Sequence, residues 1–593
     1  VGLSLDQIRA FHWAPTAQQD LFADAIRQTL DDTIDLRQQI LDLADAADTR
    51  AKARLLDDAT TFTRRARDLA DLCLGAFFSE AKPAAREKER LRRLALARAW
   101  LGDDDADTAA EVRRLAAEFR SEIPAFHWML ELPEVFYAER PDPLAGGKPG
   151  VAWMDAFVGN PPFLGGRRVR SELGDAYTEW LGTAFEASMN ADLSAHFFTR
   201  AHALLGPHGA AGLIATNTIA QGDTRTSGLA KLIASGAALY DATDSLPWPG
   251  EAAVTVSVVH FAVGEPSDHT RPFRLGGRVV PAINSRLRPT PERPAPASLS
   301  ANATLSYNGC LVLGLGFTIT TDERASLVTR DGRNAERIFP YLGGQEVNNS
   351  PTQTFSRYVI SFGNLSLREA EAWPDLLEIV RERVKPERDR VRRDTHRKYW
   401  WHFGDKRPAL QAALAPLPRC LVTSIVSKHL LFAWQPTDRI FSHKLYVFPV
   451  ATWPWFTVLQ SRIHAAWTWL LSSTMKTDLN YSASDCFDTF PFPPDMADEA
   501  LADAGEALYT ARAAYLIAEN QGLTATYNQL KDAAITTEPI QHLRALHDAL
   551  DRAVIRAYGW YQHDPDGHPL RATQGHPIPP RPPPHRAPPP PTP

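Results

Sequence analysis

The sequence predicts an α/β domain that is preceded by a helical region and followed by a separate α+β domain. Between Met154 and Val263, short apolar runs rich in Val, Ile and Phe alternate with helical stretches, which is typical of a parallel sheet covered by helices. After a bridge with several prolines, short strands, many aromatic residues and a basic helix are mixed, which indicates a second kind of domain. A chain of 593 residues is also long for one core, so three or four packed units are expected.

Six segments follow one another along the chain. Apolar residues at spacings of three and four predict helices over residues 1–121. The α/β domain is expected over residues 122–265, a linker over 266–304, and the α+β domain over 305–496. Helical periodicity returns over residues 497–563, and the proline-rich residues 564–593 are expected to form a disordered tail. The candidate strands of the α/β domain are Met154–Val158, Ala211–Thr216, Ala237–Ser245 and Val254–Val263.

Composition argues against several classes of protein. No run approaches the roughly 18 to 20 apolar residues that cross a bilayer, and the first residues show no secretory signal, so we expect a cytoplasmic protein without a membrane role. The net charge of -6 argues against a uniformly basic surface but leaves room for a local basic cleft. The four cysteines (Cys73, Cys310, Cys420 and Cys486) form no CxxC pair, which favours reduced, buried thiols over disulfides or zinc, and no metal site is expected.

The most informative stretch is the loop that follows the first candidate strand, where Asn160, Pro161, Pro162 and Phe163 follow one another. These residue types suit methyl transfer to an exocyclic amino group. The lone pair of such a nitrogen is delocalised into the ring, so two rigid acceptors must draw on both amino hydrogens. The side-chain oxygen of Asn160 and the carbonyl of Pro161 supply them, while the prolines stiffen the loop. Phe163 can stack on a base that has been rotated out of the duplex.

The tetrapeptide also has a plainer interpretation, because Asn-Pro-Pro serves as a turn and Phe as core in many proteins. Its position at the end of an apolar strand favours the catalytic interpretation. Attack on a methyl sulfonium displaces a good leaving group directly, so this chemistry requires neither a metal nor a covalent enzyme intermediate.

Several blocks around this loop occur in an order that points to a family. The loop continues as Phe163-Leu164-Gly165-Gly166; residues 127–136 precede it, and residues 192–198, 212–222 and 244–254 follow it. Together these blocks resemble the amino-group DNA methyltransferases, specifically the large adenine-specific (N6) enzymes of the MmeI-like and related fused restriction-modification and phage-defence type. The resemblance covers roughly residues 122–264.

This resemblance implies part of a class I (Rossmann-like) methyltransferase sheet, S-adenosylmethionine as cofactor, and double-stranded DNA as substrate. It makes Asn160, Pro161, Pro162 and Phe163 the catalytic loop. Trp248 would help to shape the base pocket, with structural packing as the alternative. Outside the loop, Asp192 could simply cap a helix, and the turn Thr216-Asn217-Thr218 could be scaffold or touch DNA.

The cofactor-binding residues stay unknown at this point. Members of the family hold the cofactor with a glycine-rich turn of the Asp-Pro-Ala-Cys-Gly-Ser-Gly kind and a later acidic residue. The near match at residues 142–150 has no apolar strand ahead of it and no helix behind it, so we expect a loop there. Val1-Gly2-Leu3 resembles the middle of a family member, so we expect an N-terminally truncated chain or half of a split enzyme, and a separate chain could supply the motif. No nuclease signature precedes the helices.

Two clusters in the α+β domain are candidates for reading DNA. Residues 341–349 resemble the opening of the family's target-recognition domain, here residues 305–496. A basic strip from Arg381 to Arg407 adjoins residues 399–403, which are mostly aromatic; it can neutralise phosphates while the rings wedge against the duplex, or be a solvated helix face with a buried aromatic end. A second cluster lies over residues 424–429 and 442–444. The DNA-binding candidates are Trp248, Arg392, Arg393, Arg397, Lys398, Lys428 and Lys444.

The sequence therefore predicts a site-specific adenine-N6 DNA methyltransferase of a restriction-modification or phage-defence system. The alternative is a DNA-binding remnant or specificity subunit that lacks the cofactor site and no longer catalyses. A third hypothesis, methylation of a protein glutamine, uses the same loop chemistry but leaves the large DNA-reading extension without a purpose.

Overall fold

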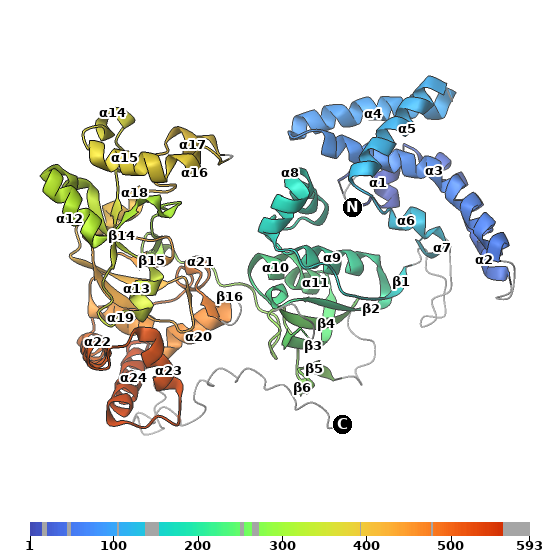
Figure 1. Cartoon of the computed structure of the whole chain (residues 1–593). Helices are drawn as coiled ribbons and strands as arrows, with labels where there is room; N and C mark the ends of the chain where they lie inside the picture. Colours follow the sequence, from blue (N-terminus) through green and yellow to red (C-terminus); the bar gives the residue numbers. More distant parts are fainter. Residues whose placement is uncertain are drawn as a thin grey trace, which may run out of the picture. The chain divides into compact units, whose positions relative to one another are not determined.

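The computed structural model describes residues 1–14, 21–43, 49–103, 106–136, 153–248, 254–263, 272–391, 393–475 and 478–560. The chain forms two units, Val1–Pro294 and Ala295–Pro593 (Figure 1). Three predictions fall outside the described residues: the loop at 142–150, the DNA-binding candidate Arg392 and the disordered tail over 564–593.

The start of the chain, up to Phe136, is helical in the described residues. Its longest helix, α3, buries a continuous apolar run from Leu69 to Phe77, because other helices contact it on several sides. This core extends to Trp180 in the following domain, whose ring meets that of Phe77 edge-on at 5.3 Å. The helices are α1 (Leu5–Ala10), α2 (Ala23–Asp42), α3 (Thr49–Ser79), α4 (Pro83–Asp103), α5 (Ala106–Glu122), α6 (Trp128–Glu131) and α7 (Pro133–Phe136).

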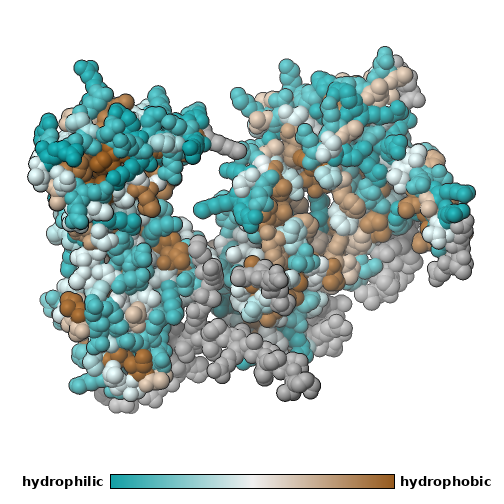
Figure 2. All heavy atoms as spheres, in the orientation of Figure 1, coloured by the Kyte–Doolittle hydropathy of each residue, from teal (hydrophilic) through white to brown (hydrophobic). Residues whose placement is uncertain are grey.

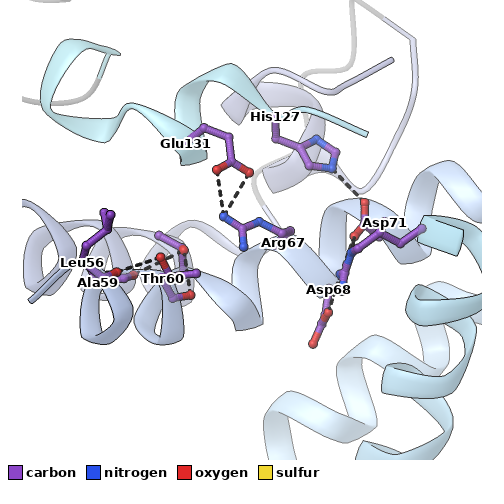
Figure 3. A network of polar contacts seen from close by, with 10 residues as sticks. Leu56, Ala59, Thr60, Arg67, Asp68, Asp71, His127 and Glu131 are labelled. Atoms are coloured by element: carbon purple, nitrogen blue, oxygen red, sulfur yellow. Dashed lines mark hydrogen bonds and ion pairs between the residues drawn. The ribbon is translucent and has the colours of Figure 1, made fainter. Parts of the chain in front are cut away.

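A buried polar network fixes the segment that leads from these helices toward the sheet (Figure 3). The backbone N–H of Leu3 donates to Nδ1 of His127 at 3.0 Å, so Nε2 carries the proton that is shared with Asp71 at 3.0 Å. Asp71 also accepts from Arg120. Farther along, the guanidinium of Arg67 on α3 binds the carboxylate of Glu131 on α6 at 3.0 Å.

The predicted α/β fold is confirmed, but the sheet of the first unit is mixed, so the expectation that all of its strands are parallel was wrong. Its order is β1-β2-β4-β3-β5-β6; β1 with β2 and β3 with β5 are parallel, whereas the other neighbours are antiparallel. The reason is that β3 and β4 form a hairpin, which is necessarily antiparallel, and β4 inserts between β2 and β3. The strands are β1 (Met154–Gly159), β2 (Leu205–Thr216), β3 (Ala237–Pro247), β4 (Thr255–Val263), β5 (Phe273–Leu275) and β6 (Arg278–Val280).

The predicted linker over residues 266–304 contains part of this sheet. β5 pairs with β3, and β6 pairs with β5 through a turn at Gly276 and Gly277, both of which have positive φ. These strands have only three residues each, which is too short for a periodicity to be recognised in the sequence.

Helices cover one face of the sheet. Alternate residues of β2 (Ala211, Leu213 and Ala215) are buried in a core with Phe198 of α9 and Leu229 of α11. The residues between them point to the opposite face, where they stay partly exposed. The helices of this domain are α8 (Gly166–Phe185), α9 (Leu193–Leu204), α10 (Gly222–Ser227) and α11 (Leu229–Ala234), with the short η1 (Asn217–Ala220) after β2.

β1 lies at the edge of the sheet, because among the described strands it pairs with β2 alone. Its residue Val158 is 91% exposed. Strands that pair in parallel are usually flanked and covered on all sides, so an open parallel edge with an exposed valine is unusual for a finished sheet.

The second unit has three small sheets, with strand orders β14-β9-β10-β8, β13-β11-β15-β7 and β12-β17-β16. Its strands are β7 (Tyr307–Asn308), β8 (Thr318–Ile319), β9 (Ile338–Leu342), β10 (Arg357–Ile360), β11 (Arg419–Ser424), β12 (Val426–Ser427), β13 (Ala433–Pro436), β14 (Ile440–Phe441), β15 (Leu445–Phe448), β16 (Ser473–Met475) and β17 (Asp478–Asn480). Its helices before the last segment are α12 (Thr321–Arg330), α13 (Gly344–Asn349), α14 (Leu367–Ala370), α15 (Pro374–Arg383), α16 (Lys385–Arg388), α17 (Asp394–Lys398), α18 (Pro408–Leu414), α19 (Trp453–Gln460), α20 (Arg462–Leu471) and α21 (Ala483–Cys486); η2 (Ser300–Asn302), η3 (Leu315–Phe317) and η4 (Gly332–Arg337) are short.

The predicted C-terminal helical segment consists of α22 (Glu499–Ala518), α23 (Leu523–Lys531) and α24 (Glu538–Ala557). It is not a separate body, because Leu508 and Leu543 share one core with Phe456 of α19. Arg512 of α22 is also buried there and donates to the carbonyl of Phe432 at 2.8 Å. The C-terminal helical segment therefore shares a hydrophobic core with the small sheets.

The four cysteines are buried and free, as predicted. Burial raises the pKa of Cys73 and of Cys420 to about 12, so these thiols stay protonated and unreactive. None of the described helices is long and apolar enough to cross a membrane. Within the described ranges, no group of three His, Cys, Asp or Glu residues is arranged to hold a metal ion.

The network around Asp71 makes a testable contribution to stability. Asp71→Ala leaves the buried His127 Nε2–H without its acceptor and removes one of the two carboxylates that bind Arg120, the other being Asp68, so we expect the free energy of opening of α3 to fall by roughly 2–4 kcal/mol. Hydrogen exchange of the α3 amides measures this change. Glu118→Ala is the control, because Glu118 pairs with Arg114 in an exposed i,i+4 pair, and it should change the exchange by less than about 1 kcal/mol. Equal effects of the two substitutions would contradict the interpretation.

Candidate active site

The candidate catalytic loop begins where β1 ends. Gly159 pairs with Leu213 of β2, and the chain then leaves the sheet at Asn160. The side chain of Asn160 is exposed and makes no hydrogen bond to any residue that the structure describes. Pro161 is buried and Pro162 exposed, so the first proline anchors the loop while the amide of Asn160 stays available.

The far end of the loop is held by the segment before α9. The carbonyl of Leu164 accepts the backbone N–H of Leu193 at 2.8 Å. Gly166 begins α8 in direct contact with Asn190, whose backbone atoms would lie only 2.4 Å from a Cβ at this position. The loop is therefore fixed at both ends before any ligand binds.

Two predicted site residues from distant parts of the chain meet at this loop. The rings of Phe163 and Trp248 lie 6.3 Å apart, centroid to centroid, and their planes cross at 89°. Trp248 follows β3 and its backbone N–H donates to the carbonyl of Val254 at 3.0 Å, which closes the hairpin beside it. The two rings form an aromatic corner next to Asn160.

A bulge in β3 directs its end toward this corner. The register against β4 shifts between Thr243 and Leu246, and Ser245 has φ +58°, a conformation that a residue with a side chain rarely adopts. Next to it, the carboxylate of Asp244 accepts the hydroxyl of the fully buried Ser257 at 2.7 Å. This bond ties the bulge to β4, so the direction of Trp248 is set by the sheet itself.

A further polar turn lies at the same end of the sheet. β4 is antiparallel to both β2 and β3, so β1, β2 and β3 run in one direction and their carboxyl ends lie at one end of the sheet. Ligands of open α/β sheets bind at the carboxyl ends of the strands. Asn217 follows β2 there, between Thr216 and Thr218, whose hydroxyls bond each other at 2.6 Å.

Asp192 has the structural role that the sequence left open. Its carboxylate accepts the backbone N–H of Ser194 at 2.9 Å and so caps α9.

The described residues at this edge do not form a cradle for S-adenosylmethionine. They offer the amides of Asn160 and Asn217 and the rings of Phe163 and Trp248, whereas a nucleoside cofactor needs a tight glycine-rich turn and a carboxylate for its ribose. The carboxylate of Asp244 is already bonded to Ser257. The described part of the site is therefore suited to the acceptor of a reaction rather than to the cofactor.

The basic strip of the second unit is only partly as predicted. Trp400, Trp401 and Phe403 are buried in the core of this unit, so they cannot wedge against DNA. Arg388 is also buried, and its guanidinium donates to the carbonyl of Val312 at 3.1 Å. The expected basic helix is divided into the short α16 and α17. The DNA-binding candidates of the strip that are exposed are Arg393, Arg397 and Lys398. Arg397 pairs with Asp394.

The structure brings the second basic cluster together. The backbone N–H of Ile425 donates to the carbonyl of Lys444 at 2.9 Å, so the turns that carry Lys428 and Lys444 adjoin. Both lysines are exposed.

Comparisons with known proteins agree with this division of the chain. Residues 143–273 match the family described as the DNA-methyltransferase domain of MmeI, and residues 297–494 match its target recognition domain. DNA methyltransferase A of Bacillus subtilis (strain 168) is 23% identical over 437 residues, which are 69% of this chain and 46% of that protein. The solved structure of the Type IIL restriction-modification enzyme MmeI in complex with DNA has the same fold, with a TM-score of 0.57 and 20% identity over 69% of this chain and 55% of that one. The chain thus spans about half the length of these relatives.

Two adjacent glycines test whether the loop is held as described. Gly166→Ala pushes a Cβ into the backbone of Asn190, so it should lower the stability of this domain by about 1–3 kcal/mol. Gly165→Ala is the matched control, because no atom lies within 4 Å of its Cβ position and its φ of -60° suits alanine. The midpoint of thermal unfolding compares them, and an equal midpoint for both variants would show that the loop is free to move.

Proposed function

Because residues 143–273 are a DNA-methyltransferase domain and residues 297–494 a target recognition domain, both of the MmeI type, we propose that the protein transfers the methyl group of S-adenosylmethionine to the N6 amino group of adenine at a defined DNA sequence. The proposal includes a role in a restriction-modification or phage-defence system. The observation that carries the choice of an amino group is Asn160, which is exposed, makes no hydrogen bond to any described residue, and lies between the end of β1 and the rigid prolines.

The loop would act on the acceptor base. The side-chain oxygen of Asn160 and the carbonyl of Pro161 accept the two hydrogens of the amino group, which lets its nitrogen become tetrahedral as the new bond forms. Phe163 stacks on the face of the rotated base, and Trp248, edge-on to it, closes the side of the pocket. Both rings are already placed by the sheet, so little ordering is required when DNA binds.

The target recognition domain would hold the DNA. We assign phosphate contacts to the exposed Arg393, Arg397 and Lys398, although the pairing of Arg397 with Asp394 weakens its share. Lys428 and Lys444 are assigned to DNA as well, on the strength of their exposure and proximity.

We further propose that a separate chain supplies the cofactor-binding motif. Two observations support this. The described residues do not form a cofactor cradle, and the open edge of β1, with Val158 91% exposed, can accept a further parallel strand. A strand in that position would end beside Asn160, which is where the cofactor is needed.

Transfer of radiolabelled methyl from S-adenosylmethionine to mixed-sequence duplex DNA tests the function, with this chain alone and with any polypeptide encoded beside it. Label should appear in adenine, and Asn160→Ala should reduce the rate by roughly a hundredfold or more, because one of two acceptors is lost. Glu118→Ala, at an exposed position of α5, is the control and should keep the full rate. DNA binding without any label under either condition would favour the rival function, a DNA-binding remnant or specificity subunit.

A further inference from the structure

Three turns and one strand end from distant parts of the recognition domain meet at one place. The carbonyl of Gly344, at the start of α13, accepts the hydroxyl of Ser424 at 3.3 Å, where β11 ends. Ile425 in turn accepts the backbone N–H of Tyr481 at 2.7 Å and donates to the carbonyl of Lys444. Since Val426 pairs with Asn480, the end of β17 belongs to the same place. We call this place the turn cluster: residues 343–349, 424–428, 442–444 and 480.

The floor of the turn cluster is polar although it is buried. Ser424, Ser427 and Asn348 are between 4% and 9% exposed. The amide nitrogen of Asn348 reaches the hydroxyl of Ser427 at 3.4 Å, while its amide oxygen has no partner among the described residues. A buried acceptor of this kind needs a donor from outside, either water or a ligand.

The rim of the turn cluster carries long polar side chains. Gln345, Asn349, Lys428 and Lys444 are all exposed. The acid beside them, Glu346, is neutralised by Arg357 at 3.2 Å, so it does not cancel the charge of the lysines. Asp478 lies at the opposite end of β17 from Asn480.

The backbone of the turn that carries Gln345 is fixed by contacts on both sides of this residue. A Cβ added at Gly344 would lie 2.8 Å from the hydroxyl of Ser424, so the turn packs closely against the end of β11. The next residue along, Glu346, binds the backbone N–H of Gly343 and closes the turn. A side chain on such a fixed turn can present both atoms of its amide in one orientation, which is what recognition of a base edge requires.

The basic strip around Arg393 lacks these properties. Trp400, Trp401 and Phe403 are buried in the core, although Tyr399 is 42% exposed, and Arg397 is paired with Asp394. The strip can contribute charge through exposed residues such as Arg390, Arg393 and Lys398 but offers no side-chain amide, since residues 381–407 contain neither asparagine nor glutamine. Of the two candidate DNA faces, only the turn cluster combines exposed side-chain amides with lysines that make no ion pair to a described residue.

We propose that the turn cluster is the base-reading edge of the recognition domain and that Gln345 determines specificity at one base pair. This inference rests on the proposed function, since it takes duplex DNA as the ligand. The amide of Gln345 suits an adenine, whose major-groove edge offers one acceptor and one donor side by side. Lys428 and Lys444 contact the flanking phosphates and set the register of the turn on the duplex.

Selection from a pool of random duplexes by the full chain tests this assignment without any need for catalysis. The wild-type chain should enrich a defined sequence. Gln345→Ala, and Gln345→Met, which keeps the length but removes the amide, should each relax the preference at one position by about ten- to a hundredfold and leave the other positions unchanged. Gln541→Ala, an exposed glutamine on α24, is the control and should select the wild-type sequence.

The lysines are tested by the salt dependence of binding. Lys428→Ala and Lys444→Ala should each weaken binding to all sequences and reduce the slope of log affinity against log salt by about one. Lys88→Ala on the exposed side of α4 should leave the slope unchanged.

The outcomes separate this inference from the proposed function. An unchanged sequence preference in both Gln345 variants, or an unchanged salt slope in both lysine variants, overturns the assignment of the turn cluster. Enrichment of a defined sequence by the wild-type chain would still support the DNA binding that the proposed function requires. A wild-type chain that binds no DNA overturns both. Circular dichroism of each variant confirms that the fold is retained.

Discussion

The parallel pairing of β1 with β2 is the interaction on which the candidate active site depends. It fixes Gly159 opposite Leu213, and with that register the next residue, Asn160, leaves the sheet at the edge where β2 and β3 also end. A shift by one residue would turn Val158 and its neighbours to the other face and carry the loop away from Trp248. The aromatic corner, the bulge at Ser245 and the anchoring of α8 on Asn190 all presuppose this one register.

Much of this arrangement could be predicted from the sequence, because its signals are local. An apolar run ending in Asn-Pro-Pro-Phe specifies a strand and a stiff loop, and the four candidate strands were all found within a few residues of their ends, except for the early start of β2 at Leu205. Pairing partners are not local. The insertion of β4 between β2 and β3, and the addition of β5 and β6 from the expected linker, depend on contacts that periodicity does not encode. The meeting of Phe163 and Trp248 followed from the family resemblance rather than from any pattern in the residues.

The basic residues of the recognition domain show the same limit. In the sequence, Arg388 and its neighbours are as good candidates for DNA binding as Lys428 and Lys444, because all of them carry positive charge. In the structure, Arg388 is buried against backbone carbonyls, whereas the two lysines are exposed. An arginine can be used to satisfy interior carbonyls as readily as to bind phosphate, and only its surroundings decide between the two uses. Aromatic residues beside basic ones are equally ambiguous, since Trp400 and Trp401 belong to the core.

The open edge of β1 also affects how copies of the protein associate with one another. Unpaired backbone groups beside an exposed valine will bond to whatever extended chain arrives first, including another copy of the same strand. Self-association through β1 therefore increases with the concentration of the protein, so its oligomeric state depends on how much of it is present.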